Sequence, residues 1–259
     1  MGNLTNWIAE NMVLAMLVMT RLSTLLMALP AIGSGVPKRV RALLAIVITA
    51  LLLPSVAEQT GSASLPGVDN LVDLAIAMAR EGVIGLLIGA TIQLIITGLQ
   101  LAGEAITSTG GMQLGDAVDP TTGSSMPALA RLVGMLVTAV MLAVGGHRIL
   151  LGVLIDSFVA LPAGHVVFHD AMMDLVITQL AAGTAAGVRV AAPVVATLLL
   201  SNLVTGLVSR TMPQINVLAI GLSINALALL VVTALTIGSA GLIFQDELAN
   251  AAERLTELW

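Results

Sequence analysis

The chain alternates between long uncharged apolar runs and short breaks that contain charges, Pro or Gly. Three of these runs reach the roughly 18 residues that mark a membrane-spanning helix, and they cover 82–103, 190–209 and 211–245. Three shorter runs are bounded by charged residues and cover 22–37, 42–57 and 132–147. No stretch alternates between apolar and polar residues as a strand does. The pattern therefore predicts an all-α integral membrane protein, built of helical hairpins with kinked helices.

The breaks between the apolar runs occur where Pro and Gly residues stand in the sequence. Pro54 begins a polar, Gly- and Ser-rich stretch that continues to Asn70, so we expect the preceding apolar helix to end at Pro54. The longest irregular stretch inside the apolar body is 110–127, which contains four glycines and two prolines. A further break falls at 211–216, and the acidic tail at 246–259 is predicted as a short amphipathic helix.

The composition narrows the class of protein. Only 10% of the 259 residues are charged and 58% are hydrophobic, with a mean hydropathy of +1.04. Soluble domains carry about 25% charged residues, so the composition argues against a soluble enzyme. The net charge of −5, without a basic stripe, argues against a nucleic acid partner. The chain has two Trp and no Tyr, whereas membrane spans usually carry aromatic belts, and this favours a surface that faces proteins more than lipid.

No residue pattern points to catalysis or to a metal. The chain lacks cysteine, which excludes a disulfide framework and thiol chemistry. It also lacks a phosphate-binding Gly-Lys loop, the zinc motif His-Glu-x-x-His and the hydrolase motif Gly-x-Ser-x-Gly. The histidines, His147, His165 and His169, flank a Pro/Gly break without well-placed carboxylates. We therefore expect no catalytic residue, no metal site and no cofactor.

Charged and polar side chains within or beside the apolar runs are candidates for contacts between helices or subunits. A charge at the centre of a bilayer costs roughly 2.5–3.5 kcal/mol on insertion scales, so partners within protein are favoured over lipid. The candidates are Arg21, Arg41, Arg80, Glu81, Glu104, Arg131, Arg189, Arg210, Gln214 and Asn216. Arg80 and Glu81 are adjacent on one helix, where side chains point about 100° apart, so they do not form a facing pair. A proton relay through Arg80, Glu81 and Glu104 is the alternative.

Two pairs of glycines have the spacing that lets helices cross closely. They are Gly85 with Gly89, and Gly183 with Gly187. The pairs predict close helix crossings, although the spacing also arises by chance in a chain with 25 glycines.

Two functional classes fit these residues. One is a secondary transporter with a broken helix at its centre, for which the purified chain alone would show saturable uptake of a small molecule. The other is a subunit of a larger membrane assembly. Transporters of that kind usually show paired broken segments in two halves, and only one long irregular stretch occurs here, so the subunit is favoured.

Four motifs stand in order along nearly the whole chain. They are Pro30-x-x-Gly33 with Val36-Pro37-x-x-Val40-Arg41; Gln100-Leu101-Ala102-Gly103-Glu104-x-Ile106 with Gly110 and Asp119-Pro120; Ser157-Phe158-x-x-Leu161-Pro162-x-Gly164; and Pro193 with Asn202-x-x-x-Gly206-x-x-Ser209-Arg210-x-x-Pro213-Gln214-x-Asn216. In this combination the chain resembles the FliR/SctT family of type III secretion export-gate subunits. It departs from the family's pattern at Gly111 and Gln113, in a loop that often runs Gln-Met-Gly.

The resemblance implies a multi-pass protein of the bacterial inner membrane, in the flagellar basal body. Members of the family assemble with FliP-like and FliQ-like subunits into a helical export-gate rosette, with FlhB at its cytoplasmic side and FlhA below. Unfolded flagellar subunits pass through this channel, membrane lipid surrounds it, and the family's members catalyse nothing. The counterpart in a virulence injectisome is the alternative.

The resemblance also implies a division of the chain. Residues 1–125 then resemble FliP-like hairpins that end in the Gly-rich segment at 110–127. Residues 126–259 form a second half with a FliQ-like hairpin at about 172–244 and a short C-terminal helix.

In this family the Gly-rich segment forms a plug inside the channel. The residues expected to form this plug or gate are Gly110, Gly111, Met112, Gly115, Asp116, Asp119, Pro120 and Gly123. Glycine adopts backbone conformations that other residues resist. We expect the segment to seal the resting pore and to be displaced by the substrate. The alternative is a static turn between two helices.

Overall fold

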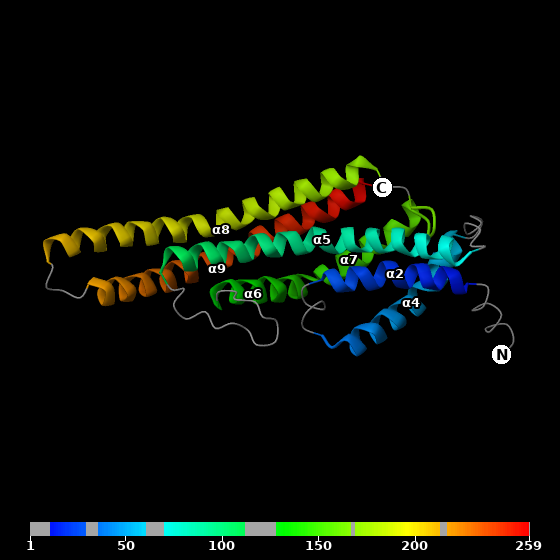
Figure 1. Ribbon diagram of the computed structural model, residues 1–259, viewed down its shortest axis with the longest axis horizontal. Helices are drawn as coiled ribbons and strands as arrows, with labels where there is room; N and C mark the ends of the chain where they lie inside the picture. The colour runs from blue at the N-terminus through cyan, green and yellow to red at the C-terminus, as the bar shows by residue number, and fades with distance from the viewer. Residues whose placement is uncertain are drawn as a thin grey trace. The chain divides into compact units, whose positions relative to one another are not determined.

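The chain folds as helices throughout the part that the structure describes. The structure is a computed structural model that describes residues 11–29, 36–60, 70–111, 128–166, 169–212 and 217–258. The helices in these ranges are α2 (Met12–Ala28), α4 (Lys38–Thr60), α5 (Leu71–Thr109), α6 (Ala128–Val144), α7 (Gly146–Ala160), α8 (Asp170–Thr211) and α9 (Val217–Glu257) (Figure 1). The predicted all-α fold is confirmed.

Three of these helices are long and apolar enough to cross a membrane: α4, α5 and α8. The number rises to five if each of two bent helix pairs, one of which lies within α9, counts as one span. The predicted runs at 82–103 and 190–209 lie inside α5 and α8. The shorter run at 42–57 also lies inside one of these helices, because the candidate span in α4 covers Lys38–Glu58 and includes charged residues at its ends.

The prediction that a helix ends at Pro54 was wrong, since α4 continues through Pro54 to Thr60. A proline inside a helix removes one backbone hydrogen bond and crowds the preceding turn. In α4 the buried face nevertheless extends past the proline, because Ala45, Thr49, Leu53 and Val56 are all buried at helical spacing. Packing of this face outweighs the local cost of Pro54.

The tail that was expected to form a separate short helix is the last part of α9, which continues to Glu257. Phe244, Leu248, Ala251 and Leu255 are buried at helical spacing, so one buried face continues to the end of α9. No proline occurs in this stretch to stop the helix.

The chain divides into two compact units, and the boundaries between them fall within α5, α8 and α9. Unit 1 comprises Met1–Gln93, Gly145–Gln179 and Ala249–Trp259, and unit 2 comprises Leu94–Val144 and Leu180–Leu248. Each unit therefore contains residues from both sides of position 125. The division into a FliP-like half and a FliQ-like half stays a prediction about resemblance in sequence.

In unit 1, α4 packs on α2 and α7, and α2 lies alongside the first part of α5 (Figure 1). A Cβ atom added at Gly85 would collide with the backbone of Arg21, and one added at Gly89 would collide with Ala28. The predicted close crossing at this glycine pair is confirmed, and its partner is α2.

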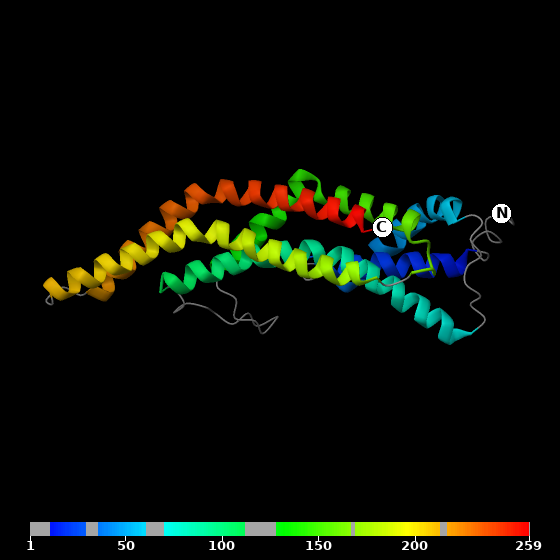
Figure 2. The ribbon, with the colours of Figure 1, turned by 90° about the horizontal axis from the view of Figure 1, so that it is seen from above.

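In unit 2, α8 runs beside α9, and the last part of α5 contacts α8 (Figure 2). A Cβ atom at Gly183 would collide with the backbone of Leu94, and one at Gly187 would collide with that of Gly98. The second predicted close crossing is therefore also confirmed. Gly98 completes it from α5, where a Cβ atom would in turn meet the backbone of Gly183.

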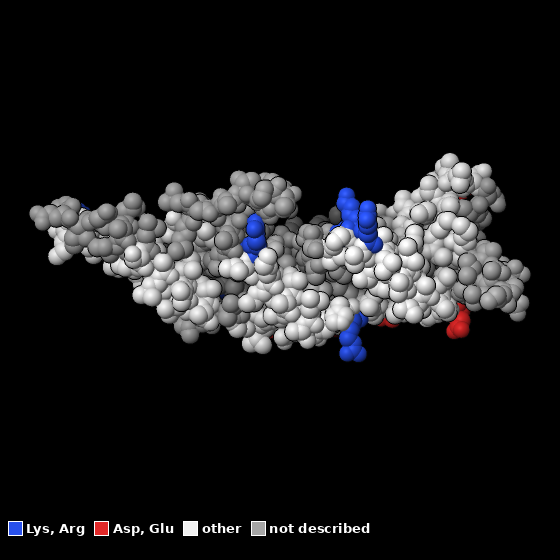
Figure 3. Space-filling model, turned by 90° about the horizontal axis from the view of Figure 1, so that it is seen from below, with Lys and Arg blue, Asp and Glu red and all other residues white. Residues whose placement is uncertain are grey.

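Much of the described surface is apolar. Side chains on α4 such as Leu43 (65% exposed) and Leu51 (72% exposed) face outward, as do Leu200 and Leu203 on α8. On the face shown in Figure 3 the described atoms include only a few Lys, Arg, Asp or Glu side chains. Water alone does not stabilise an apolar surface of this extent, so lipid or other proteins cover it.

Candidate functional site

An ion pair lies in the core of unit 1. Arg21 of α2 donates from Nε to Oε2 of Glu81 in α5 at 2.6 Å, and both side chains are fully buried. Arg80, the neighbour of Glu81, is exposed. An isolated buried charge costs several kcal/mol, so each of these two ions depends on the other.

Other groups satisfy the rest of the pair, which we call the Arg21–Glu81 cluster. Nη1 of Arg21 donates to both the carbonyl oxygen and Oγ of Ser157, at 3.0 Å each, and Nη2 donates to the carbonyl oxygen of Leu161 at 3.1 Å. The guanidinium carbon lies 4.0 Å from the ring centroid of Phe158. Oε1 of Glu81 accepts from the backbone N–H of Gly164 at 2.8 Å.

The partners of this cluster are the residues of one sequence motif, Ser157-Phe158-x-x-Leu161-Pro162-x-Gly164. The motif ends α7 and forms the turn that follows it, with Gly164 at φ +86°, a conformation that favours glycine. The cluster therefore joins α2, α5, α7 and this turn. In the sequence the motif only carried a family resemblance, and nothing in it indicated Arg21 as its partner.

A second polar cluster lies in unit 2, where α8 and α9 meet the end of α5. Nδ2 of Asn225 donates to Oδ1 of Asn202 at 2.7 Å and to the carbonyl oxygen of Gly110 at 3.4 Å. Oδ1 of Asn225 accepts from Oγ of Ser201 at 2.7 Å, and Nδ2 of Asn202 donates to the carbonyl oxygen of Thr109 at 3.1 Å. We call these five residues the asparagine cluster.

The Gly-rich segment begins at the asparagine cluster. Gly110 is buried and Gly111 adopts φ +70°, so these two residues form the turn that ends α5. The other predicted plug residues, Met112, Gly115, Asp116, Asp119, Pro120 and Gly123, lie outside the described residues. The segment joins α5 to α6.

Two further predicted polar residues have partners within their own units. Arg189 of α8 forms an ion pair with Glu247 of α9 at 3.8 Å, although the Arg189 side chain is 67% exposed. Arg41 of α4 donates to the carbonyl oxygen of Val36 at 3.3 Å. The first contact joins α8 to α9, whereas the second lies within one short segment of the chain.

The remaining predicted polar residues do not meet at one site. Arg80 and Arg210 are exposed, Glu104 and Arg131 are partly buried, and Gln214 and Asn216 lie outside the described residues. Sequence reasoning missed Ser201 and Asn225, which both occur in long uncharged apolar runs. The sequence did offer a signal for them, namely a polar side chain inside an apolar run. Such side chains commonly form hydrogen bonds between packed helices.

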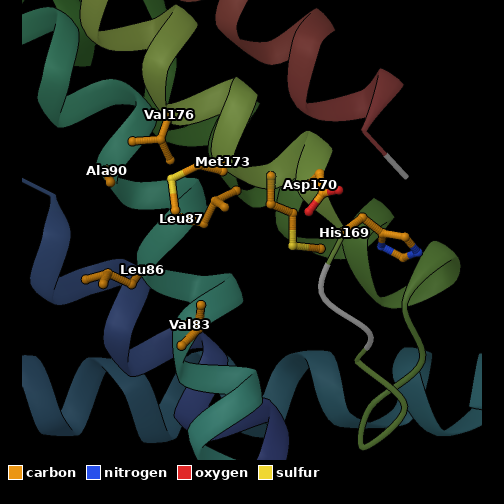
Figure 4. A pocket seen from close by; sticks show the side chains of 9 residues that line it. Val83, Leu86, Leu87, Ala90, His169, Asp170, Met173 and Val176 are labelled. Atoms are coloured by element: carbon orange, nitrogen blue, oxygen red, sulfur yellow. The ribbon is translucent and has the colours of Figure 1, made fainter.

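An apolar pocket lies among the described residues of each unit. The pocket in unit 1 measures about 520 Å³, and Figure 4 shows Leu87 of α5 and Met173 of α8 close together in its wall, with the His169 ring at one end. The pocket in unit 2 measures about 500 Å³ and is lined mainly by apolar side chains of α5, α6 and α9. Neither pocket brings together a nucleophile and a base, and no group of metal-binding side chains occurs in the described ranges.

The fold and its surface define a class: an all-α protein with several helices long and apolar enough to cross a membrane. The chain matches the family described as "Bacterial export proteins, family 1" over residues 12–251. This match covers nearly the whole chain, so the protein belongs to that family.

Individual relatives agree with the family. The chain is 28% identical to the flagellar biosynthetic protein FliR of Caulobacter vibrioides over 233 residues, 90% of this chain and 91% of the relative. It is 33% identical to FliR of Escherichia coli over 72% of this chain and 69% of the relative. It is 26% identical to the surface presentation of antigens protein SpaR of Shigella flexneri over 81% of this chain and 79% of the relative.

Proposed function

We propose that this protein is a structural and gating subunit of the bacterial flagellar type III export channel, through which unfolded flagellar subunits cross the inner membrane. The observation that carries the proposal is the family match over residues 12–251, together with the FliR relatives. The flagellar role is preferred to that of an injectisome because SpaR is less similar than either FliR relative named above.

The subunit acts in a rosette with FliP-like and FliQ-like proteins, on which FlhB and FlhA dock. The exposed apolar faces of α4 and α8 support this proposal, since an assembly offers them protein partners as well as lipid. The chain itself performs no catalysis in this role. Its contribution is to complete the channel and to keep it closed at rest.

The closing element is the Gly-rich segment that starts at Gly110. In the resting channel it blocks the passage of ions, and a passing substrate displaces it. Two features support the proposal: the segment joins two apolar helices, α5 and α6, and its start is fixed by the asparagine cluster. The competing explanation is a static turn.

Co-purification tests the assembly. The tagged protein, expressed with FliP-like and FliQ-like subunits of the same cell, is expected to purify with both of them in detergent. A monomer that binds neither subunit, or a purified chain that takes up a small molecule saturably, would contradict the proposal and favour a transporter. Loss of motility on deletion of the gene separates the flagellar role from the injectisome role.

A deletion tests the plug. The structure indicates that residues 112–123 should be removed while Gly110 and Gly111 are retained, because these two glycines end α5. Cells that carry the deletion should lose membrane potential in the absence of substrate, measured with a potential-sensitive dye. The control replaces 112–123 by a Ser/Thr linker of equal length. An assembled complex that shows no ion leak with the deletion rejects the plug.

A further inference from the structure

The apolar pocket of unit 1 is a groove between α5 and the first turns of α8, with a volume of about 520 Å³ (Figure 4). We call it the α5–α8 groove. Leu86 of α5 is 53% exposed and Met173 of α8 is 65% exposed, so atoms of this unit leave parts of both walls uncovered. Ligand pockets in proteins measure about 300–1,000 Å³. The α5–α8 groove is therefore large enough to hold a small ligand.

The two ends of the α5–α8 groove differ in polarity. Figure 4 shows Val83 and Asp170 toward one end and Ala90 and Val176 at the other, which is apolar. Asp170 is exposed and begins α8. Arg80 is also exposed and precedes Val83 by three residues, so these two residues lie on the same side of α5. One end of the groove thus carries a carboxylate on one wall and a guanidinium beside the other.

Both walls change from charged to uncharged along the same direction. In α5 no charged residue occurs between Glu81 and Glu104, and in α8 none occurs between Asp174 and Arg189. Both helices are long and apolar enough to cross a membrane. In a bilayer the polar headgroups lie outside the hydrocarbon core. The charged end of the groove therefore suits headgroups, and its apolar walls suit acyl chains.

The charges at this end are available to a ligand. Neither Arg80 nor Asp170 forms an ion pair with another residue in the ranges that the structure describes. The planar guanidinium of Arg80 suits a phosphate group, and the carboxylate of Asp170 accepts strong hydrogen bonds from an ammonium group. A molecule that carries a phosphate, an amine and an apolar chain complements all three parts of the groove.

We propose that the α5–α8 groove binds a membrane phospholipid whose headgroup carries a primary amine, as in phosphatidylethanolamine. One acyl chain lies along the apolar walls, the phosphate contacts Arg80, and the ammonium group donates to Asp170. Met172 and Met173 line the groove, and their unbranched side chains adapt to the shape of an acyl chain. This site goes beyond the proposed role in export and does not depend on it.

Protection of a thiol tests the site in the purified full chain. The chain contains no cysteine, so Leu86→Cys places a single thiol in the wall of the groove, where bound lipid should slow its reaction with a maleimide. Phosphatidylethanolamine, phosphatidylcholine and phosphatidylglycerol with identical acyl chains are titrated in mixed detergent micelles. Phosphatidylethanolamine should protect at a concentration about 3- to 10-fold lower than the other two, the effect of one partly exposed charged hydrogen bond. Choline has no N–H donor, and glycerol has no cation.

Variants of the charged end separate the roles of its two groups. Asp170→Asn should remove the preference for phosphatidylethanolamine and leave protection by the other two lipids unchanged. Asp174→Asn is the matched control, because it removes the same charge one turn further along α8, at an exposed residue that does not line the groove. This control should keep the preference. Arg80→Gln should weaken protection by all three lipids by a similar factor, since all three carry the phosphate.

Three results would overturn the proposal. The first is equal protection by the three lipids when Asp170 is present, and the second is an equal loss of preference in Asp170→Asn and Asp174→Asn. The third is a thiol at position 86 that no lipid protects but a copurified partner subunit does, because the groove then holds a protein segment. Leu86 and Asp170 are both exposed, so neither substitution removes a buried contact of the fold.

Discussion

The Arg21–Glu81 cluster allows a quantitative test of the fold of unit 1. Glu81→Gln keeps the shape of the side chain but leaves the buried guanidinium of Arg21 without a counter-charge. Removing one partner of a buried ion pair costs about 3–5 kcal/mol, a large part of the total stability of about 5–15 kcal/mol that is typical of proteins. Since about 1 kcal/mol lowers the melting temperature of a chain of 150–250 residues by about 2–4 °C, we expect a decrease of about 6–20 °C.

The assay is the temperature at which half of the protein remains in the purified complex in detergent. Glu247→Gln is the matched control, because the Arg189–Glu247 pair is longer, at 3.8 Å, and the Arg189 that it leaves unpaired is 67% exposed, although the Glu247 side chain is only 11% exposed. Water solvates the Arg189 charge that remains, and exposed charges contribute about 0–1 kcal/mol to such pairs, so the control should lower the midpoint temperature by no more than about 4 °C.

A double variant gives the sharper result. Arg21→Met with Glu81→Leu removes both charges, and replacing a buried pair by apolar residues is often neutral or stabilising. This variant should recover much of the stability lost in Glu81→Gln. If Glu81→Gln matches the control, or if the double variant is no better than the single one, the reasoning about a buried charge is refuted.

Three further predictions use the same midpoint. Gly98→Ala should lower stability by about 1–3 kcal/mol, because its Cβ atom would collide with the backbone of Gly183. Gly206→Ala is the control and should raise stability by about 0.5–1 kcal/mol, because its Cβ atom would meet nothing within 4 Å. A Gly98→Ala variant that is more stable than Gly206→Ala would contradict the close crossing. Pro54→Ala should raise stability by up to about 3 kcal/mol, since it restores a backbone donor inside α4; a lower midpoint would mean that the helix needs the proline. Phe158→Leu should cost about 2 kcal/mol by removing the ring under Arg21, and an unchanged midpoint would exclude that contribution.

The sequence predicted the parts of the fold that depend on local pattern. Apolar runs at 82–103 and 190–209 marked α5 and α8, and the glycine spacing marked both close crossings. It failed at Pro54 and in the acidic tail, where a buried face at helical spacing continued through residues that locally favour a break or a new helix. Tertiary packing determines where these helices end, and the positions of charges and prolines in the sequence do not reveal that packing.

The polar clusters were less accessible from the sequence. Arg21 and Glu81 were both candidates, but their separation of 60 residues gave no reason to pair them. Asn225 was not a candidate. Its partners Asn202 and Gly110 lie 23 and 115 residues away, so nothing near it in the sequence indicated these contacts. A sequence can show that a polar group must find a partner within an apolar run, whereas only the fold shows which group that is.

The length of α5 limits how much of it a bilayer can cover. A helix of 39 residues rises about 58 Å, and a hydrocarbon core is about 30 Å thick. Even at a tilt of 40°, the upper end of the usual range, the core encloses only about 26 residues. About a third of α5 therefore extends beyond the acyl chains, into headgroups, water or neighbouring proteins. If that third includes the first turns of α5, where Leu71 and Val72 are exposed, a neighbouring protein is the environment that buries these apolar side chains.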